Sequence, residues 1–162
     1  MNSLRDEAIT VLLVEDDAPT LWRLQDALAK AGYQVRAAGT LTDARACLAQ
    51  GAPRVLLTDL QLPDGHGVDL IRETRRRFPE TEIMVISILG DEESVISAIT
   101  VGATGYLLKD ATPDEIVRCV RAVASGHNFV NPSMTTYLVQ RTRRIERFTR
   151  TGPNALQYEV TI

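Results

Sequence analysis

The hydrophobic positions of this chain form two kinds of pattern that alternate along the sequence. Five short stretches are mostly apolar or β-branched and have the length of β-strands: residues 9–14, 34–37, 55–58, 83–87 and 105–108. Several of them are apolar at consecutive positions, which is typical of strands that are buried on both faces. The pattern therefore predicts five strands in a sheet that is covered on both sides.

Segments with the helical spacing of apolar residues follow each of these strands. Each segment ends near a glycine or a proline, which commonly terminates a helix. The apolar positions are Leu21, Leu24 and Leu28 before Gly32; Leu41, Ala44 and Leu48 before Gly51; Val68, Ile71 and Phe78 before Pro79; Val95 and Ile99 before Gly102; and Ile116, Val120 and Val123 before Gly126. Strands that alternate with helices through short connections predict an α/β fold with a doubly wound, five-stranded parallel sheet and five helices.

A different pattern begins after Phe129. Pro132 can start a helix, in which five arginines face a single acid, Glu146. The apolar positions of this segment are Met134, Leu138, Ile145 and Phe148, and its arginines are Arg141, Arg143, Arg144, Arg147 and Arg150. We expect one domain at residues 8–126, an arginine-rich linker or tail helix at 127–150, and a loose segment at 151–162 that is either native or foreign to the natural protein.

Composition narrows the classes of protein without choosing among them. The chain has 162 residues, 44% of them hydrophobic, which is enough for one core. A net charge of -3, from 18 basic and 21 acidic residues, gives no overall reason to expect binding to nucleic acid or a membrane. Cys47 and Cys119 lie in separate helical segments, and the N-terminus lacks the pattern of a secretory signal. We therefore expect a cytoplasmic protein with reduced thiols and no membrane partner.

Polar residues stand at the ends of four predicted strands. Glu15, Asp16 and Asp17 follow the first strand, Asp59 the third, Ser87 the fourth and Lys109 the fifth. The carboxyl ends of parallel strands lie at one edge of a sheet, where ligands of such folds collect. Grouped carboxylates repel one another by about 4 kcal/mol per close pair at intermediate dielectric, and a hard divalent cation would relieve this repulsion.

Each of these residues also has a simpler explanation. Asp17 can cap a helix, with its acidic neighbour favoured by the helix dipole. Asp59 can belong to the turn that Pro63, Asp64, Gly65 and Gly67 form after it. Ser87 can satisfy a strand end, and a lysine is commonly a solvated surface charge. The joint placement at one edge of the sheet favours a functional site.

Four motifs, in this order, resemble the CheY-like response-regulator receiver domain of two-component signalling. They are VEDDAP, LLTDLQLPDGHG, VIS followed by GDEES, and GATGYLLKD followed by TPDEI, and the resemblance covers about residues 9–126. The wording of GATGYLLKDATPDEIVRCVRAVASG is most similar to the NarL/FixJ group, which has a LuxR-type helix-turn-helix. The resemblance implies a flavodoxin-like strand order.

The resemblance also implies a role for each residue of the site. Asp59 would be the phosphoacceptor, which receives a phosphoryl group from a sensor histidine kinase. Asp16 would bind Mg²⁺ directly and Glu15 through water, the backbone carbonyl of Gln61 would supply another oxygen, and Asp59 itself would complete the protein ligands. Asp17 would be a spare acid beside this metal site, with capping as its main role. Lys109 would contact a phosphoryl oxygen.

Ser87 and Tyr106 correspond to the switch pair of the family. The Ser87 hydroxyl would turn toward the phosphoryl group and the Tyr106 ring would follow it inward; the simpler alternative is a partly buried ring with its hydroxyl in water. Ile88 departs from the family pattern, because receivers usually have a small residue there. A bulky side chain at this place would control access to the phosphate, so we expect slow phosphorylation and slow hydrolysis.

The predicted function is a phosphorylation-controlled signalling module, not an enzyme acting on another substrate. Its output would be transcription regulation through a DNA-binding domain missing from this chain; a stand-alone receiver that acts by protein–protein contact is the alternative. Expected partners are a histidine kinase and a second copy of the chain, with DNA bound only through the absent domain or weakly through the arginine-rich tail. For that tail, a solvated polar face is the simpler alternative.

Two other classes fit less well. A Mg²⁺-dependent phosphatase with an aspartyl nucleophile would need a second acid two residues later, where this chain has Gln61. A flavodoxin-like nucleotide binder would need a glycine-rich phosphate loop after the first strand, where this chain has three acids.

Overall fold

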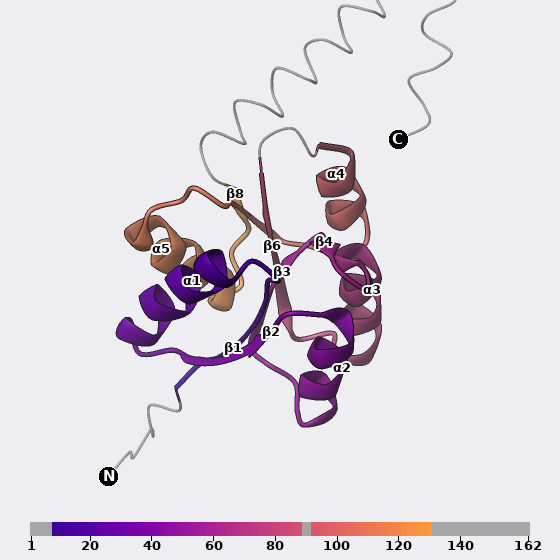
Figure 1. Ribbon diagram of the computed structural model, residues 1–162, viewed down its shortest axis with the longest axis horizontal. Coiled ribbons are helices and arrows are strands. Elements are labelled where there is room, and N and C mark those ends of the chain that lie inside the picture. Colours follow the sequence, from indigo (N-terminus) through magenta and orange to yellow (C-terminus); the bar gives the residue numbers. More distant parts are fainter. Residues whose placement is uncertain (1–7, 89–91, 131–162) are drawn as a thin grey trace, which may run out of the picture. The chain divides into compact units, whose positions relative to one another are not determined.

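The computed structural model describes residues 8–88 and 92–130 (Figure 1). Strands and helices alternate along this part of the chain. In order they are β1 (Thr10–Val14), α1 (Ala18–Lys30), β2 (Gln34–Ala38), α2 (Leu41–Ala49), β3 (Val55–Asp59), β4 (Gln61–Leu62), β5 (Gly65–His66), α3 (Gly67–Arg77), β6 (Glu82–Ser87), α4 (Glu92–Thr100), β7 (Gly105–Leu108), α5 (Pro113–Ala124) and β8 (Phe129–Val130).

The main sheet has the strand order β2-β1-β3-β6-β7-β8, and its first five strands are parallel. The five-stranded parallel sheet and the five helices predicted from the sequence are confirmed. The chain builds outward from β1 in one direction to β2 and in the other to β3, which makes the β1/β3 junction the switch point of the topology. A ligand site is therefore expected beyond the carboxyl ends of these two strands.

Two short features were not predicted. Strands β4 and β5 form a two-residue antiparallel hairpin within the turn that follows β3. Strand β8 extends the sheet beside β7, where the Phe129 amide donates to the Thr104 carbonyl over 3.2 Å. Elements of two residues are too short to show a hydrophobic period, so sequence patterns do not reveal them.

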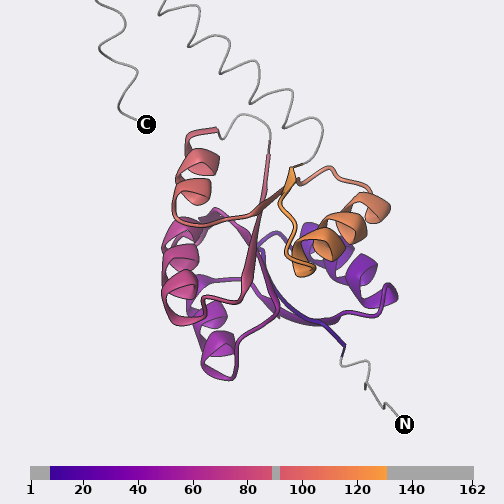
Figure 2. The ribbon, with the colours of Figure 1, turned by 180° about the vertical axis from the view of Figure 1, so that it is seen from behind.

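The helices cover both faces of the sheet. Helices α1 and α5 lie on one face and α2, α3 and α4 on the other, as the views from the two sides show (Figures 1 and 2). All five residues of β3 are buried, as expected for a central parallel strand. The core under α1 and α5 consists of Val11, Leu13, Leu24, Leu28, Val55, Leu57, Met84, Ile86, Leu107, Ala111, Ile116, Cys119, Val120, Val123 and Ala124.

Side chains cap the helices that begin at the carboxyl edge of the sheet. Asp17 caps α1, His66 caps α3, and Thr112 with Glu115 forms a capping box on α5. The side chain of Thr40 caps α2 in the same way. These caps fix the points at which the chain turns from strand to helix, and so fix the loops around the expected site.

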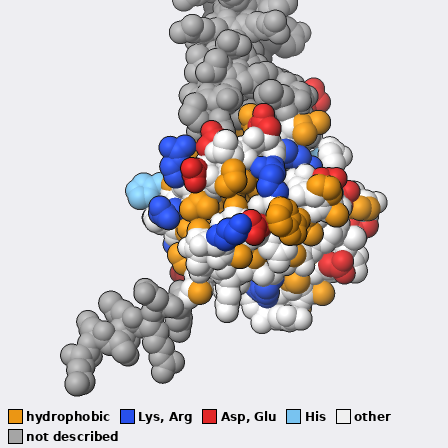
Figure 3. All heavy atoms as spheres, turned by 60° about the vertical axis from the view of Figure 1, so that its left-hand side comes forward, with side chains coloured by type: hydrophobic (Ala, Val, Ile, Leu, Met, Phe, Trp, Pro, Cys, Tyr) orange, Lys and Arg blue, Asp and Glu red, His pale blue; other side chains and the backbone are white. Residues whose placement is uncertain are grey.

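The predicted tail helix and the segment at 151–162 fall outside the described residues, except that residues 129–130 form β8. In the part of the chain that is described, no helix has both the length and the hydropathy needed to cross a membrane. On the side of the molecule where α1 and α5 lie, hydrophobic, basic and acidic side chains are interspersed (Figure 3).

Candidate functional site

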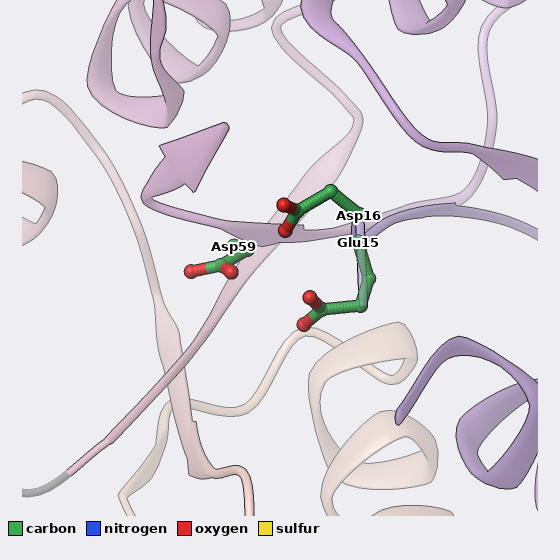
Figure 4. Close-up of side chains that lie close together, drawn as sticks. All are labelled: Glu15, Asp16 and Asp59. Atoms are coloured by element: carbon green, nitrogen blue, oxygen red, sulfur yellow. The ribbon is translucent and has the colours of Figure 1, made fainter. Parts of the chain in front are cut away.

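Three carboxylates meet beyond the ends of β1 and β3. Glu15 and Asp16 follow β1 directly and Asp59 is the last residue of β3; the pairing of Val14 with Thr58 brings the two strand ends level. One carboxylate oxygen from each acid lies within 4.8 Å of the others. Figure 4 shows the three side chains extending from the two strand ends into the same space. The predicted acidic cluster therefore exists.

Glu15 is the most deeply placed of the three acids. Its side chain is fully buried, and Asp16 is exposed. Burial is the main influence on Glu15 and raises the pKa of its carboxyl group, and the nearby charge of Asp59 raises it further. The Asp17 amide, which donates to Glu15 Oε1 over 3.0 Å, acts in the opposite direction. The buried carboxylate of Glu15 therefore needs a positively charged partner.

Lys109 supplies that positive charge from the end of β7. Its Nζ lies 2.7 Å from Asp59 Oδ2 and 3.1 Å from Glu15 Oε2. Partial burial lowers the pKa of Lys109, but the hydrogen bonds that its ammonium group donates to Asp59 and Glu15 outweigh this effect, so the pKa is raised overall and the ammonium form is stabilised. The Lys109 side chain is 24% exposed, so it is partly accessible to solvent.

Asp59 is fixed from two sides. Its Oδ1 accepts the amides of Leu60 at 2.6 Å and Gln61 at 3.2 Å, while Oδ2 accepts from Lys109. Gly67 packs so closely that an added Cβ would lie 2.1 Å from the Asp59 carbonyl oxygen. The side chain is only 6% exposed, so these contacts orient a carboxylate that is almost fully buried.

Asp17 does not join the other acids. Its Oδ2 accepts the Thr20 amide at 3.1 Å and the Thr20 hydroxyl at 2.5 Å, and these bonds lower the pKa of its carboxyl group. This geometry is the helix cap that the sequence predicts for Asp17, in which the carboxylate accepts both hydrogen bonds from Thr20.

The predicted switch and access residues belong to β6, β7 and the position directly after β6. Ser87 ends β6 and is buried; its carbonyl accepts the Lys109 amide at 2.9 Å and its hydroxyl donates to the Ile88 carbonyl at 3.3 Å. Tyr106 is in β7 with 3% of its surface exposed, paired in register with Val85. Ile88 is 63% exposed at the end of β6. Ser87 and Lys109 are thus adjacent.

The residues present fit a divalent cation. Three carboxylates face one ammonium group, which leaves an excess of two negative charges if all three are ionised. Oε2 of Glu15 is buried and makes no hydrogen bond with acceptable geometry, although the Lys109 nitrogen is near it. Carboxylate oxygens are the ligands that Mg²⁺ prefers.

Several residues that shape the site were not singled out from the sequence. The sequence predicts Gly67 only as a turn residue, and Thr58 is a buried threonine whose hydroxyl donates to the Asp59 carbonyl at 2.8 Å. Asp64 accepts the amides of Leu41 and Thr42 and so joins the β4–β5 turn to the start of α2. The GHG spacing after Asp59 was the one local signal for Gly67; the partners of Asp64 are too distant in sequence to be inferred.

Comparison with known proteins identifies the family of this chain. The family model of the response regulator receiver domain matches residues 11–121. The transcriptional regulatory protein DegU of Brevibacillus brevis is 36% identical over 93 residues, which are 57% of this chain and 39% of DegU. The photosynthetic apparatus regulatory protein RegA of Cereibacter sphaeroides is 31% identical over 134 residues, 83% of this chain and 72% of RegA. The chain thus spans well under half of DegU.

A solved structure supports the fold. The crystal structure of a LuxR-family two-component response regulator from Aurantimonas superposes with a TM-score of 0.76 at 22% identity, covering 83% of this chain and 98% of that one. Receiver domains of this family are phosphorylated on an aspartate, work with histidine kinases and bind Mg²⁺ at an acidic pocket. The match to the family model over most of the chain, together with the acidic cluster and Lys109, shows that this chain belongs to the response regulator receiver domain family.

Proposed function

We propose that Asp59 is the phosphoacceptor of this chain and that a sensor histidine kinase is the physiological donor. The observation that supports this most is the contact between Lys109 Nζ and Asp59 Oδ2 within a cluster of three carboxylates. A carboxylate that is buried, oriented by two backbone amides and neighboured by a cation is prepared to act as a nucleophile.

The transfer step needs positioning more than covalent help. An Asp59 carboxylate oxygen attacks phosphorus, a P–O bond forms, and the bond from phosphorus to the donor atom breaks with its electron pair going to the donor. The Lys109 ammonium exchanges part of its contact with Asp59 for a phosphoryl oxygen and stabilises the negative charge there. The two amides that hold Oδ1 keep the carboxylate in line during the step.

Asp16 and Glu15 are proposed to hold Mg²⁺, Asp16 directly and Glu15 through water, with Asp59 and the carbonyl of Gln61 as further ligands. When bound, Mg²⁺ neutralises charge on the phosphoryl oxygens. Asp17 is proposed to remain the cap of α1, because its carboxylate is already bonded to Thr20.

The phosphorylated state is proposed to move Ser87 and Tyr106. The Ser87 hydroxyl now donates to its neighbour's carbonyl at 3.3 Å, a long bond that a phosphoryl oxygen would replace favourably. Tyr106 would then adjust its position in β7 and change the surface near α4. Phosphorylation would act by shifting a population between two arrangements.

The output is proposed to be transcription regulation through a DNA-binding domain that acts together with this receiver domain. The curated relatives include a named transcriptional regulator, of which this chain matches 39%. A second copy of the chain is the proposed contact that phosphorylation strengthens, and the arginine-rich tail at 127–150 would contact DNA only weakly. A stand-alone receiver that acts through protein contact is the second candidate.

Dephosphorylation is proposed to be slow and intrinsic to the chain, with a water molecule attacking phosphorus and regenerating the Asp59 carboxylate. Ile88 would slow this step by standing at the approach to the acceptor. We propose a cytoplasmic location, which fits the two free cysteines, Cys47 and Cys119.

Phosphorylation with acetyl phosphate tests this function directly. The chain is incubated with acetyl phosphate with and without Mg²⁺, and its intact mass is measured. We expect a gain of one phosphoryl group that needs Mg²⁺ and is lost in Asp59→Asn. Asp64→Asn is the matched control, because this acid of the same loop is bonded to α2. A gain that persists in Asp59→Asn would refute the assignment.

A further inference from the structure

Arg23 of α1 reaches across to the loop that joins β7 to α5. Its Nη1 donates to the Ala111 carbonyl at 2.5 Å and its Nη2 donates to the carbonyl of Lys109. Helix α1 is anchored on the sheet by Leu24, Ala27 and Leu28, which are buried. The guanidinium group therefore extends from a rigid helix. Its planar fork binds two backbone carbonyls of one loop.

These bonds fix the backbone of Lys109 together with a bond from the sheet. The Lys109 amide donates to the Ser87 carbonyl at 2.9 Å, and its carbonyl accepts from Arg23. The turn is closed by the Ala111 amide, which donates to the Leu108 carbonyl at 3.0 Å. Both peptide groups around the Lys109 Cα are thus held, one by β6 and one by α1.

We propose that Arg23 is a positioning residue for Lys109 in phosphoryl transfer; this inference rests on the proposed function of Asp59. The lysine side chain is long and flexible, so its Nζ stays near Asp59 only if the backbone from which the side chain extends is fixed. Without the guanidinium, the two carbonyls exchange their partner for water and the loop gains freedom. Small displacements of a group that stabilises charge slow a reaction strongly, by up to about 100-fold for a shift near 1 Å.

A purely structural role for Arg23 is the competing explanation, and the chain contains a matched control for it. Arg36 of β2 donates to the carbonyls of Cys47 and Gly51, both at 2.9 Å, and joins β2 to the end of α2. Helix α2 begins at the carboxyl edge of the sheet, so its end lies at the opposite edge from the acidic cluster. Arg36 thus uses the same chemistry away from the site.

The experiment compares Arg23→Gln, Arg23→Lys and Arg36→Gln in phosphorylation by acetyl phosphate with Mg²⁺. We expect Arg23→Gln to slow the reaction about tenfold, within the range for misplaced groups. Arg23→Lys, which keeps a donor and the charge, should recover part of the rate, while Arg36→Gln should react like wild type. In a Lys109→Met background, Arg23→Gln should cause no further slowing, since the residue it positions is absent.

Hydrogen exchange of the Lys109 and Ala111 amides gives a second measurement that does not depend on phosphorylation. We expect both amides to exchange faster in Arg23→Gln and at the wild-type rate in Arg36→Gln. Equal slowing by Arg23→Gln with and without Lys109, or unchanged transfer and exchange in Arg23→Gln, would overturn the proposal. Failure of wild type to gain a phosphoryl group would instead refute the function of Asp59, and amide exchange alone would then decide whether Arg23 holds the loop.

Discussion

The ammonium nitrogen of Lys109 lies 2.7 Å from Oδ2 of Asp59 and joins the end of β7 to the end of β3. The same nitrogen lies 3.1 Å from Glu15 Oε2, so one cation spans acids from two strands. Their separation in the sequence is large, and only the parallel sheet brings them together.

Replacing Lys109 should slow phosphoryl transfer. Lys109→Met removes the cation that meets the phosphoryl oxygen, and we expect a rate about 100-fold lower, as for the loss of one charge-stabilising donor. Lys109→Arg should also be slow, because a planar fork does not fit a point contact. Rates are measured by intact mass against Lys30→Met, because Lys30 is 75% exposed and pairs at 2.8 Å with Asp26 of its own helix. A rate for Lys109→Met equal to that of Lys30→Met would contradict the role.

Ile88 should limit access to the acceptor. It is 63% exposed at the end of β6, next to Ser87, and Ile88→Ala should speed both phosphorylation and hydrolysis of the phosphorylated chain. Ile99→Ala removes the same atoms from an isoleucine of α4 that is 45% exposed, and should leave both rates unchanged. No change in either rate on Ile88→Ala would remove this explanation.

Gly67 should be intolerant of a side chain. A Cβ at this position would lie 2.1 Å from the Asp59 carbonyl oxygen and 3.0 Å from the Leu60 Cα, so the backbone beneath the acceptor would have to move. We expect Gly67→Ala to lower the free energy of unfolding by about 1–3 kcal/mol, measured by urea denaturation. Gly39→Ala is the control, because its nearest neighbour would be at 4.0 Å. Equal stability of the two variants would show that the loop adapts.

Asp64 should contribute stability that depends on pH. The amides of Leu41 and Thr42 donate hydrogen bonds to its carboxylate and lower the pKa of that group below its usual value. A lowered pKa in the folded state means that the contribution is complete above the unfolded value and is lost as the pH falls through the folded value. The difference in urea midpoint between wild type and Asp64→Asn should therefore be large near about pH 6 and shrink below about pH 4. A difference that is constant over this range would refute the linkage.

The sequence predicts the fold because its strands are apolar at consecutive positions and its helices end at glycine or proline. It also places the acids and Lys109 at one edge, since parallel strands share the direction of their carboxyl ends. The two-residue strands β4, β5 and β8 have no period to detect, and so were missed.

The supporting residues could not be predicted because their partners are distant. Arg23 binds carbonyls of residues 86 and 88 positions further along the chain, and nothing local to α1 indicates such partners. The sequence predicts Gly67 as a turn residue, whereas the close approach of the Asp59 carbonyl is what requires glycine at this position. The sequence predicts capping as the main role of Asp17, and the geometry identifies Thr20 as the residue that its carboxylate binds.

The assignment of Asp59 as the phosphoacceptor is tested most directly by locating the phosphoryl group in the chain. After reaction with acetyl phosphate and Mg²⁺, the chain is treated with borohydride, which reduces an aspartyl phosphate to homoserine and releases phosphate. Peptides are then sequenced by tandem mass spectrometry. We expect homoserine at position 59, with Glu15, Asp16 and Asp64 unchanged. Homoserine at Asp16 or Asp64, or none in a chain that has gained a phosphoryl group, would contradict it.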